Sequence, residues 1–172
     1  MRKRNLNRVL AAVILLAGCG SSTPSTKLKN YQTYYQAVMD QIHFTAESRF
    51  YTLSAEMEEV SEGTYSYYIV LDEPKIAMYN VVMIAVANDT QLQDATTMMP
   101  SIGIFDGPYS LIPNQVNSDD GFVKGMVISG SSDTDEVSLK MLVEWQDKNG
   151  ENIQREYHQI TLNQSGMQYV ES

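Results

Sequence analysis

Residues 79–87 of this 172-residue chain read Tyr-Asn-Val-Val-Met-Ile-Ala-Val-Ala. Every residue after Asn80 is apolar, so an extended segment here has no polar face. A strand with two apolar faces is typical of the centre of a sheet that is covered on both sides. We therefore predict a central strand over residues 79–87 with a packed layer against each face.

The segment upstream of this strand alternates between apolar and polar residues, as a strand with one buried face does. The run Ser61-Glu62-Gly63 divides the segment with a turn, and Pro74 ends it. The apolar positions are Tyr51, Leu53, Ala55 and Met57 before the turn and Tyr65, Tyr67, Ile69 and Leu71 after it. This pattern predicts a hairpin with one face toward the core.

Downstream, short apolar segments are separated by runs rich in Gly, Pro, Asn and Asp. The predicted strands are residues 101–105, 109–112, 122–129, 137–145 and 153–162, and the predicted loops include 88–97 and 130–133. Asp147-Lys148-Asn149-Gly150 predicts a tight hairpin between the last two strands, because Asn-Gly favours such turns. This spacing predicts an antiparallel β-sandwich of about seven strands. The sandwich domain spans residues 48–163, and a frayed tail follows over 164–172.

An apolar stripe with helical spacing precedes the strands. It consists of Leu28, Tyr31, Tyr35, Val38 and Ile42. The stripe predicts one helix over about residues 27–45, within an N-terminal helical segment that spans 27–47. Tyrosine combines a large contact area with a polar tip, so Tyr31, Tyr34 and Tyr35 are candidate interaction residues. The alternative is that these tyrosines line the seam between helix and sheet.

The number and spacing of the predicted strands are similar to those of an immunoglobulin-like domain with an added N-terminal helix. The similarity concerns architecture alone, because the chain has no cysteine pair. Its one tryptophan, Trp145, ends a late strand, whereas an immunoglobulin domain carries its tryptophan early. We therefore expect a mainly β, immunoglobulin-like sandwich and draw no function from the similarity.

The N-terminus has the features of an export signal. Cations at positions 2, 3, 4 and 8 precede an apolar run over residues 9–17. This run is shorter than the ~20 residues that a membrane-spanning helix needs. The run ends in Leu16-Ala17-Gly18-Cys19, which holds the chain's single cysteine. In this form the segment resembles the signal peptide and lipobox of bacterial lipoproteins.

This resemblance implies that residues 1–18 are a removable signal peptide and that Cys19 is the acylated first residue of the mature chain. Residues 19–26 are then the lipidated cysteine and a flexible tether. The membrane is the implied partner of the acyl chains, and the domain faces outside the cytoplasm. Gly20 is not the aspartate typical of inner-membrane retention, so the outer membrane stays open in a cell with two membranes. The alternative is an ordinary secreted protein.

Loss of the signal peptide changes the charge of the chain. It removes four of 12 Lys and Arg residues and leaves eight against 21 Asp and Glu, a net charge of −13. An acidic surface repels phosphate backbones and anionic headgroups, which disfavours nucleic-acid binding and electrostatic docking to membranes. A single cysteine committed to lipid also leaves neither an intramolecular disulfide nor a cysteine nucleophile.

The histidines and methionines suggest no particular active site. His43 and His158 lack a Gly-x-Ser-x-Gly frame or a comparable setting, and we expect both to be surface or edge side chains. The pair Met98-Met99 is compatible with Cu(I), but core packing explains most methionines.

The densest acidic loop contains Asp133, Asp135 and Glu136. Clustered loop oxygens suit Ca²⁺, which makes these residues weak metal candidates, with a solvated turn as the alternative. No cofactor is predicted.

Together these features predict a lipid-anchored, non-catalytic interaction module of the bacterial cell envelope. Its sheet edge or loops would bind another envelope protein or a surface ligand. Two alternatives stay open. One is an enzyme or enzyme subunit that uses paired carboxylates on a glycan. The other is a Ca²⁺ or copper carrier.

Overall fold

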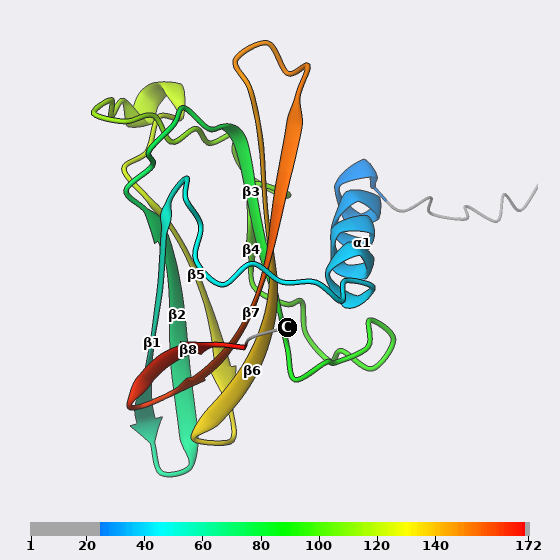
Figure 1. Ribbon diagram of the computed structural model, residues 1–172. Helices are drawn as coiled ribbons and strands as arrows, with labels where there is room; N and C mark the ends of the chain where they lie inside the picture. The colour runs from blue at the N-terminus through cyan, green and yellow to red at the C-terminus, as the bar shows by residue number, and fades with distance from the viewer. Residues whose placement is uncertain (1–24, 171–172) are drawn as a thin grey trace, which may run out of the picture.

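The structure is a computed structural model that describes residues 25–170. Two antiparallel sheets pack face to face, and α1 (Thr26–Met39) lies on the outer face of the larger sheet (Figure 1). The predicted β-sandwich with one N-terminal helix is therefore confirmed. The predicted signal peptide, Cys19 and most of the tether lie outside the described residues.

The smaller sheet has three strands in the order β1-β2-β5, and the larger has five in the order β4-β3-β6-β7-β8. The bounds of the smaller sheet are β1 (Thr52–Ser61), β2 (Thr64–Asp72) and β5 (Met126–Ser132). Those of the larger are β3 (Tyr79–Ala87), β4 (Ser101–Ile102), β6 (Glu136–Gln146), β7 (Ile153–Asn163) and β8 (Gly166–Tyr169). The first, second and fifth strands share one sheet, as strands A, B and E do in immunoglobulin domains.

The central strand β3 is covered on both faces, as predicted. Its Val81, Met83 and Ala85 side chains belong to the core between the sheets. The alternate residues Val82 and Ile84 face α1 and belong to a second apolar cluster. One strand thus joins two packed layers, because both of its faces are apolar.

Both predicted hairpins are present. Leu53 lies opposite Leu71 in the β1–β2 pair, and Gly63 occupies the turn with a φ of +70°. The β6–β7 turn is built around Asp147, whose carboxylate accepts hydrogen bonds from the Asn152 side chain and the Glu151 backbone amide. These hydrogen bonds, that of Asn152 above all, lower the pKa of Asp147.

The helix is shorter than predicted. It begins after Ser25, whose hydroxyl accepts a hydrogen bond from the Leu28 amide, and it ends at Met39. Ile42, which continues the apolar stripe in the sequence, is 73% exposed. The chain instead runs without regular structure toward β7, where the Thr45 amide donates to the Tyr157 carbonyl. This tertiary hydrogen bond, together with others, outweighs the helical pattern after residue 40.

Several predicted ends of strands were also wrong. Residues 166–169 form β8 on the edge of the larger sheet, so the C-terminal segment is not frayed through this region. Strand β5 continues through residues 130–132, which the turn-like composition had assigned to a loop. Residues 109–112 form only isolated bridges, including Met78 with Leu111.

Candidate functional site

A cavity of about 520 Å³ opens at the side of the sandwich where β5 ends. One wall is the second half of β5 with the turn after it, residues 129–134. The other wall is the loop between β3 and β4, which contributes residues between 87 and 100. Cavities of this volume are typical of ligand sites, and most of the lining residues here are polar.

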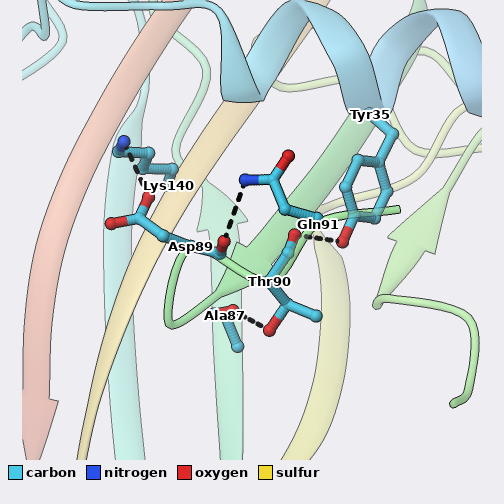
Figure 2. Close-up of polar contacts among 6 residues, drawn as sticks. All are labelled: Tyr35, Ala87, Asp89, Thr90, Gln91 and Lys140. Atoms are coloured by element: carbon cyan, nitrogen blue, oxygen red, sulfur yellow. Dashed lines mark hydrogen bonds and ion pairs between the residues drawn. The ribbon is translucent and has the colours of Figure 1, made fainter. Parts of the chain in front are cut away.

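The loop after β3 starts with a backbone turn that the sequence favours. Asn88 and Asp89 both have a φ of +52°, a region that Asn and Asp enter more readily than other residues with a side chain. The Asn88 side chain accepts a hydrogen bond from the Ser138 amide. Lys140 of β6 forms an ion pair of 2.7 Å with Asp89, as Figure 2 shows. The start of the loop is thereby attached to β6.

Two helix tyrosines hold the rest of this loop. The Tyr35 hydroxyl donates to the Thr90 carbonyl at 2.7 Å (Figure 2). Nine residues later, the Tyr31 hydroxyl accepts a hydrogen bond of 2.8 Å from the Met99 amide. Both tyrosines are buried between α1 and β3, so in this conformation they support the loop and face no solvent. They occupy the helix–sheet seam that the sequence had left as the alternative.

Tyr67 forms the floor of the cavity. Its side chain crosses the inner side of β5 at Gly130, where a Cβ atom would overlap the tyrosine hydroxyl. The residue is only 1% exposed, and its hydroxyl has no hydrogen-bond partner in the part of the chain that the structure describes. Burial raises the pKa of Tyr67 to about 12, so the hydroxyl stays protonated at neutral pH.

The cavity brings together acidic residues from distant segments. Asp94 lines one wall and Asp133, one of the predicted weak metal candidates, lines the other. The turn that carries Asp133 is held by the Ser132 hydroxyl, which accepts from the Thr134 amide. Asp135 and Glu136 do not line the cavity. Within residues 25–170 no group of three or more His, Cys, Asp or Glu side chains is placed to hold a metal ion.

The third candidate tyrosine, Tyr34, has a different contact. Its hydroxyl donates to Glu144 Oε1 at 2.7 Å, and Arg155 Nε binds the other carboxylate oxygen at 2.6 Å. Glu144 is buried, which requires such compensation of its charge. Burial, followed by the hydrogen bond to Glu144, raises the pKa of Tyr34. A second cavity, of about 340 Å³, contains Glu144 and Asp106.

Both carboxylates of this second cavity are engaged by the protein itself. Asp106 accepts from the Gly103 amide with one oxygen and from the Tyr109 hydroxyl with the other. Glu144 is bound by Tyr34 and Arg155 as described above. All four carboxylate oxygens therefore accept a hydrogen bond already, and the acids stabilise this corner of the fold.

The expectation of a surface position holds for His43 and is wrong for His158, which is fully buried. His158 Nδ1 lies 2.7 Å from the Thr45 carbonyl, so this nitrogen carries the proton and donates. Nε2 then accepts from the Tyr51 hydroxyl at 2.7 Å. The signal that could have located His158 is its spacing of two and four residues from the buried Ile160 and Leu162.

The described residues thus define an immunoglobulin-like β-sandwich with a polar cavity beside one edge strand. No protein-family model, curated protein or solved structure matches the chain. No helix between residues 25 and 170 is long and apolar enough to cross a membrane.

Proposed function

We propose that this chain is a lipid-anchored binding module of the bacterial cell envelope that acts by contact. The signal-peptide pattern over residues 1–18 and the lipobox that ends at Cys19 support the anchor. Two or more acyl chains hold a protein stably at a membrane surface, whereas one chain binds only marginally. The domain lies outside the cytoplasm, and Gly20 is compatible with the outer membrane of a cell that has two.

The observation that carries the binding role is the cavity beside β5. This strand ends the order β1-β2-β5, so its outer edge pairs with no other described strand. Both edges of the smaller sheet contact the larger sheet, β1 at β7 and β8 and β5 at β4. The β5 side combines a strand that lacks a second strand partner with a recess, and a partner finds both backbone and side-chain contacts there.

The state of Glu144, Asp106 and His158 favours contact over turnover at these three positions. Glu144 and Asp106 accept internal hydrogen bonds, and His158 is enclosed behind Tyr51. A general acid or base must reach the substrate proton directly or through one water. None of these three groups has that access in this arrangement.

The binding role is tested by photo-crosslinking in intact cells. A photoreactive residue replaces Ser131, which is exposed in the cavity wall, and a matched variant carries it at Ile153, which is 56% exposed and lines no described cavity. We expect a discrete adduct from position 131 and none from position 153. Absence of an adduct at 131, or the same adducts from both positions, would overturn the proposal.

The anchor is tested by metabolic labelling with a fatty-acid analogue. The Cys19→Ala variant should carry no label and should leave the membrane fraction or remain uncleaved, because Cys19 is the chain's single cysteine. Equal labelling of this variant and the parent protein would refute lipid attachment at this residue.

A further inference from the structure

The charge of the cavity lining indicates which chemical class of partner the cavity binds. Asp94 and Asp133 line opposite walls, and neither carboxylate forms an ion pair within the described residues. No Lys, Arg or His lines the cavity. Lys140 lies on the neighbouring strand but is paired with Asp89. A cationic group that enters the cavity therefore meets two uncompensated carboxylates and no like charge.

The surroundings of the cavity are acidic as well. Tyr65 lies opposite Ser132 in the β2–β5 pair. Partial desolvation raises the pKa of Tyr65, and the carboxylates of Glu59 and Asp135 raise it further. Glu59 of β1 and Asp135 of the turn after β5 thus both act on Tyr65, which pairs with the end of β5. Such a field attracts a basic partner and repels an acidic one before contact.

The floor of the cavity adds a polar group that a ligand can reach. The Tyr67 side chain is 1% exposed and lines the cavity, and its hydroxyl forms no hydrogen bond with the described residues. A donor that enters the recess can form a hydrogen bond with this hydroxyl. Because Gly130 has no Cβ, the hydroxyl can lie directly beneath the β5 backbone.

The edge of β5 determines the form of the partner. An edge strand presents a row of backbone donors and acceptors, and an extended peptide can pair with it as an additional strand. Side chains of an added strand project alternately to the two faces. One of them can then point into the recess that residues 129–134 line.

We propose, on the basis of the proposed binding function, that β5 takes an extended peptide segment as an added strand. The cavity then binds a lysine or arginine side chain of this segment. Asp94 and Asp133 are the charge partners, and the Tyr67 hydroxyl accepts a hydrogen bond from the same cationic group. The ligand class is therefore a basic, extended stretch of another envelope protein.

The test is a selection of displayed random peptides on the full-length protein in detergent. We expect enrichment of Lys or Arg at one position of the selected peptides, and about a fivefold loss of affinity when that residue is changed to Gln. The Asp94→Asn, Asp133→Asn double variant should lose this preference. The matched variant Asp119→Asn, at an exposed acid in another loop, should keep it.

N-methylated versions of one selected peptide test the added strand. One peptide carries methyl groups on its odd-numbered amides and the other on its even-numbered amides. One of the two should lose binding and the other should keep it, because only one edge of the peptide faces β5. A selection without Lys or Arg enrichment, a preference that survives in the double variant, or equal binding of both methylated peptides would overturn the inference.

The crosslink from position 131 separates this inference from the function on which it rests. An adduct at 131 together with no basic preference overturns the peptide inference alone. No adduct at 131 and no selected peptide would overturn both.

Discussion

His158 shows how a single side chain connects three parts of the fold. Its ring lies between the Thr45 carbonyl of the segment after α1 and the Tyr51 hydroxyl just before β1. It is fully buried on β7, and burial lowers its pKa. The folded protein therefore holds this ring neutral, with one nitrogen as donor and the other as acceptor.

The lowered pKa makes a prediction about acid stability. Below an unfolded-state pKa of about 6.5, the unfolded chain takes up a proton at this residue that the folded chain does not, so stability falls with pH. This residue contributes at most about 1.4 kcal/mol per pH unit. We expect urea unfolding to show that the free energy of unfolding falls less between neutral and mildly acidic pH in His158→Gln than in the parent protein. The exposed His43 gives the control His43→Gln, and equal losses in parent and His158→Gln would contradict the prediction.

Gly130 is required by the residue beneath it. A Cβ atom at this position would overlap the end of the Tyr67 ring, which the core holds in place. We expect Gly130→Ala to lower the free energy of unfolding by about 1–3 kcal/mol, as overpacking does. Ser131→Ala on the same strand should change it by less than about 0.5 kcal/mol.

A double-mutant cycle checks this cause. The double variant Gly130→Ala, Tyr67→Leu should lose less free energy of unfolding than the sum of the losses in the two single variants, because leucine is shorter than tyrosine. Additive losses would show that Gly130 is needed for some other reason than the approach of Tyr67.

At the scale of elements, α1 acts as a support for the loop between β3 and β4. Tyr35 and Tyr31 bind its two ends, at Thr90 and Met99. Tyr34 binds Glu144 of β6 and has no hydrogen bond with this loop among the described residues. The helix therefore affects the cavity through the loop wall that it holds.

Tyr35→Phe tests this role. Removal of the hydroxyl should cost about 0.5–1.5 kcal/mol of stability and accelerate amide exchange within residues 91–97. Tyr34→Phe should destabilise the fold without accelerating exchange in that loop. Unchanged exchange in Tyr35→Phe would show that the helix does not hold the loop in place.

The elements that the sequence predicts well are those whose pattern is local. The two apolar faces of residues 79–87 and the alternation in β1 and β2 are visible without any knowledge of the rest of the chain. The end of α1 is not visible in this way. Ile42 continues the apolar stripe, but the Thr45 amide donates a tertiary hydrogen bond to β7. Strand β8 has only four residues and forms because β7 offers an edge and the core accepts Met167 and Tyr169.

The cavity could not be predicted from the sequence, because it also depends on tertiary contacts. Tyr67, Asp94 and Asp133 are far apart in the chain, and the sandwich topology brings them together. Asp133 stands out in the sequence for its charge, but nothing local indicates that it shares a cavity with Asp94. Tyr31 and Tyr35 were noted for their aromatic area, whereas their contribution to the site lies in their hydroxyl groups.

At the scale of the whole molecule, the two sides of the sandwich differ. On one side β1 contacts β7 and β8 (Figure 1). On the other, β5 ends its sheet and contacts β4, and the loop between β3 and β4 forms the far wall of a cavity. The central claim of the proposed function is that a partner occupies this second side while the lipid anchor holds the domain at the membrane.

Hydrogen exchange measured by mass spectrometry on isolated membranes tests that claim most directly. The backbone amides of residues 126–134 should exchange more slowly in membranes than in the detergent-purified protein, because a bound partner covers the β5 edge. Amides of the exposed segment 114–117 should exchange equally in both samples and serve as the control. Equal exchange of residues 126–134 in membranes and in detergent would contradict the claim that this edge is a binding site.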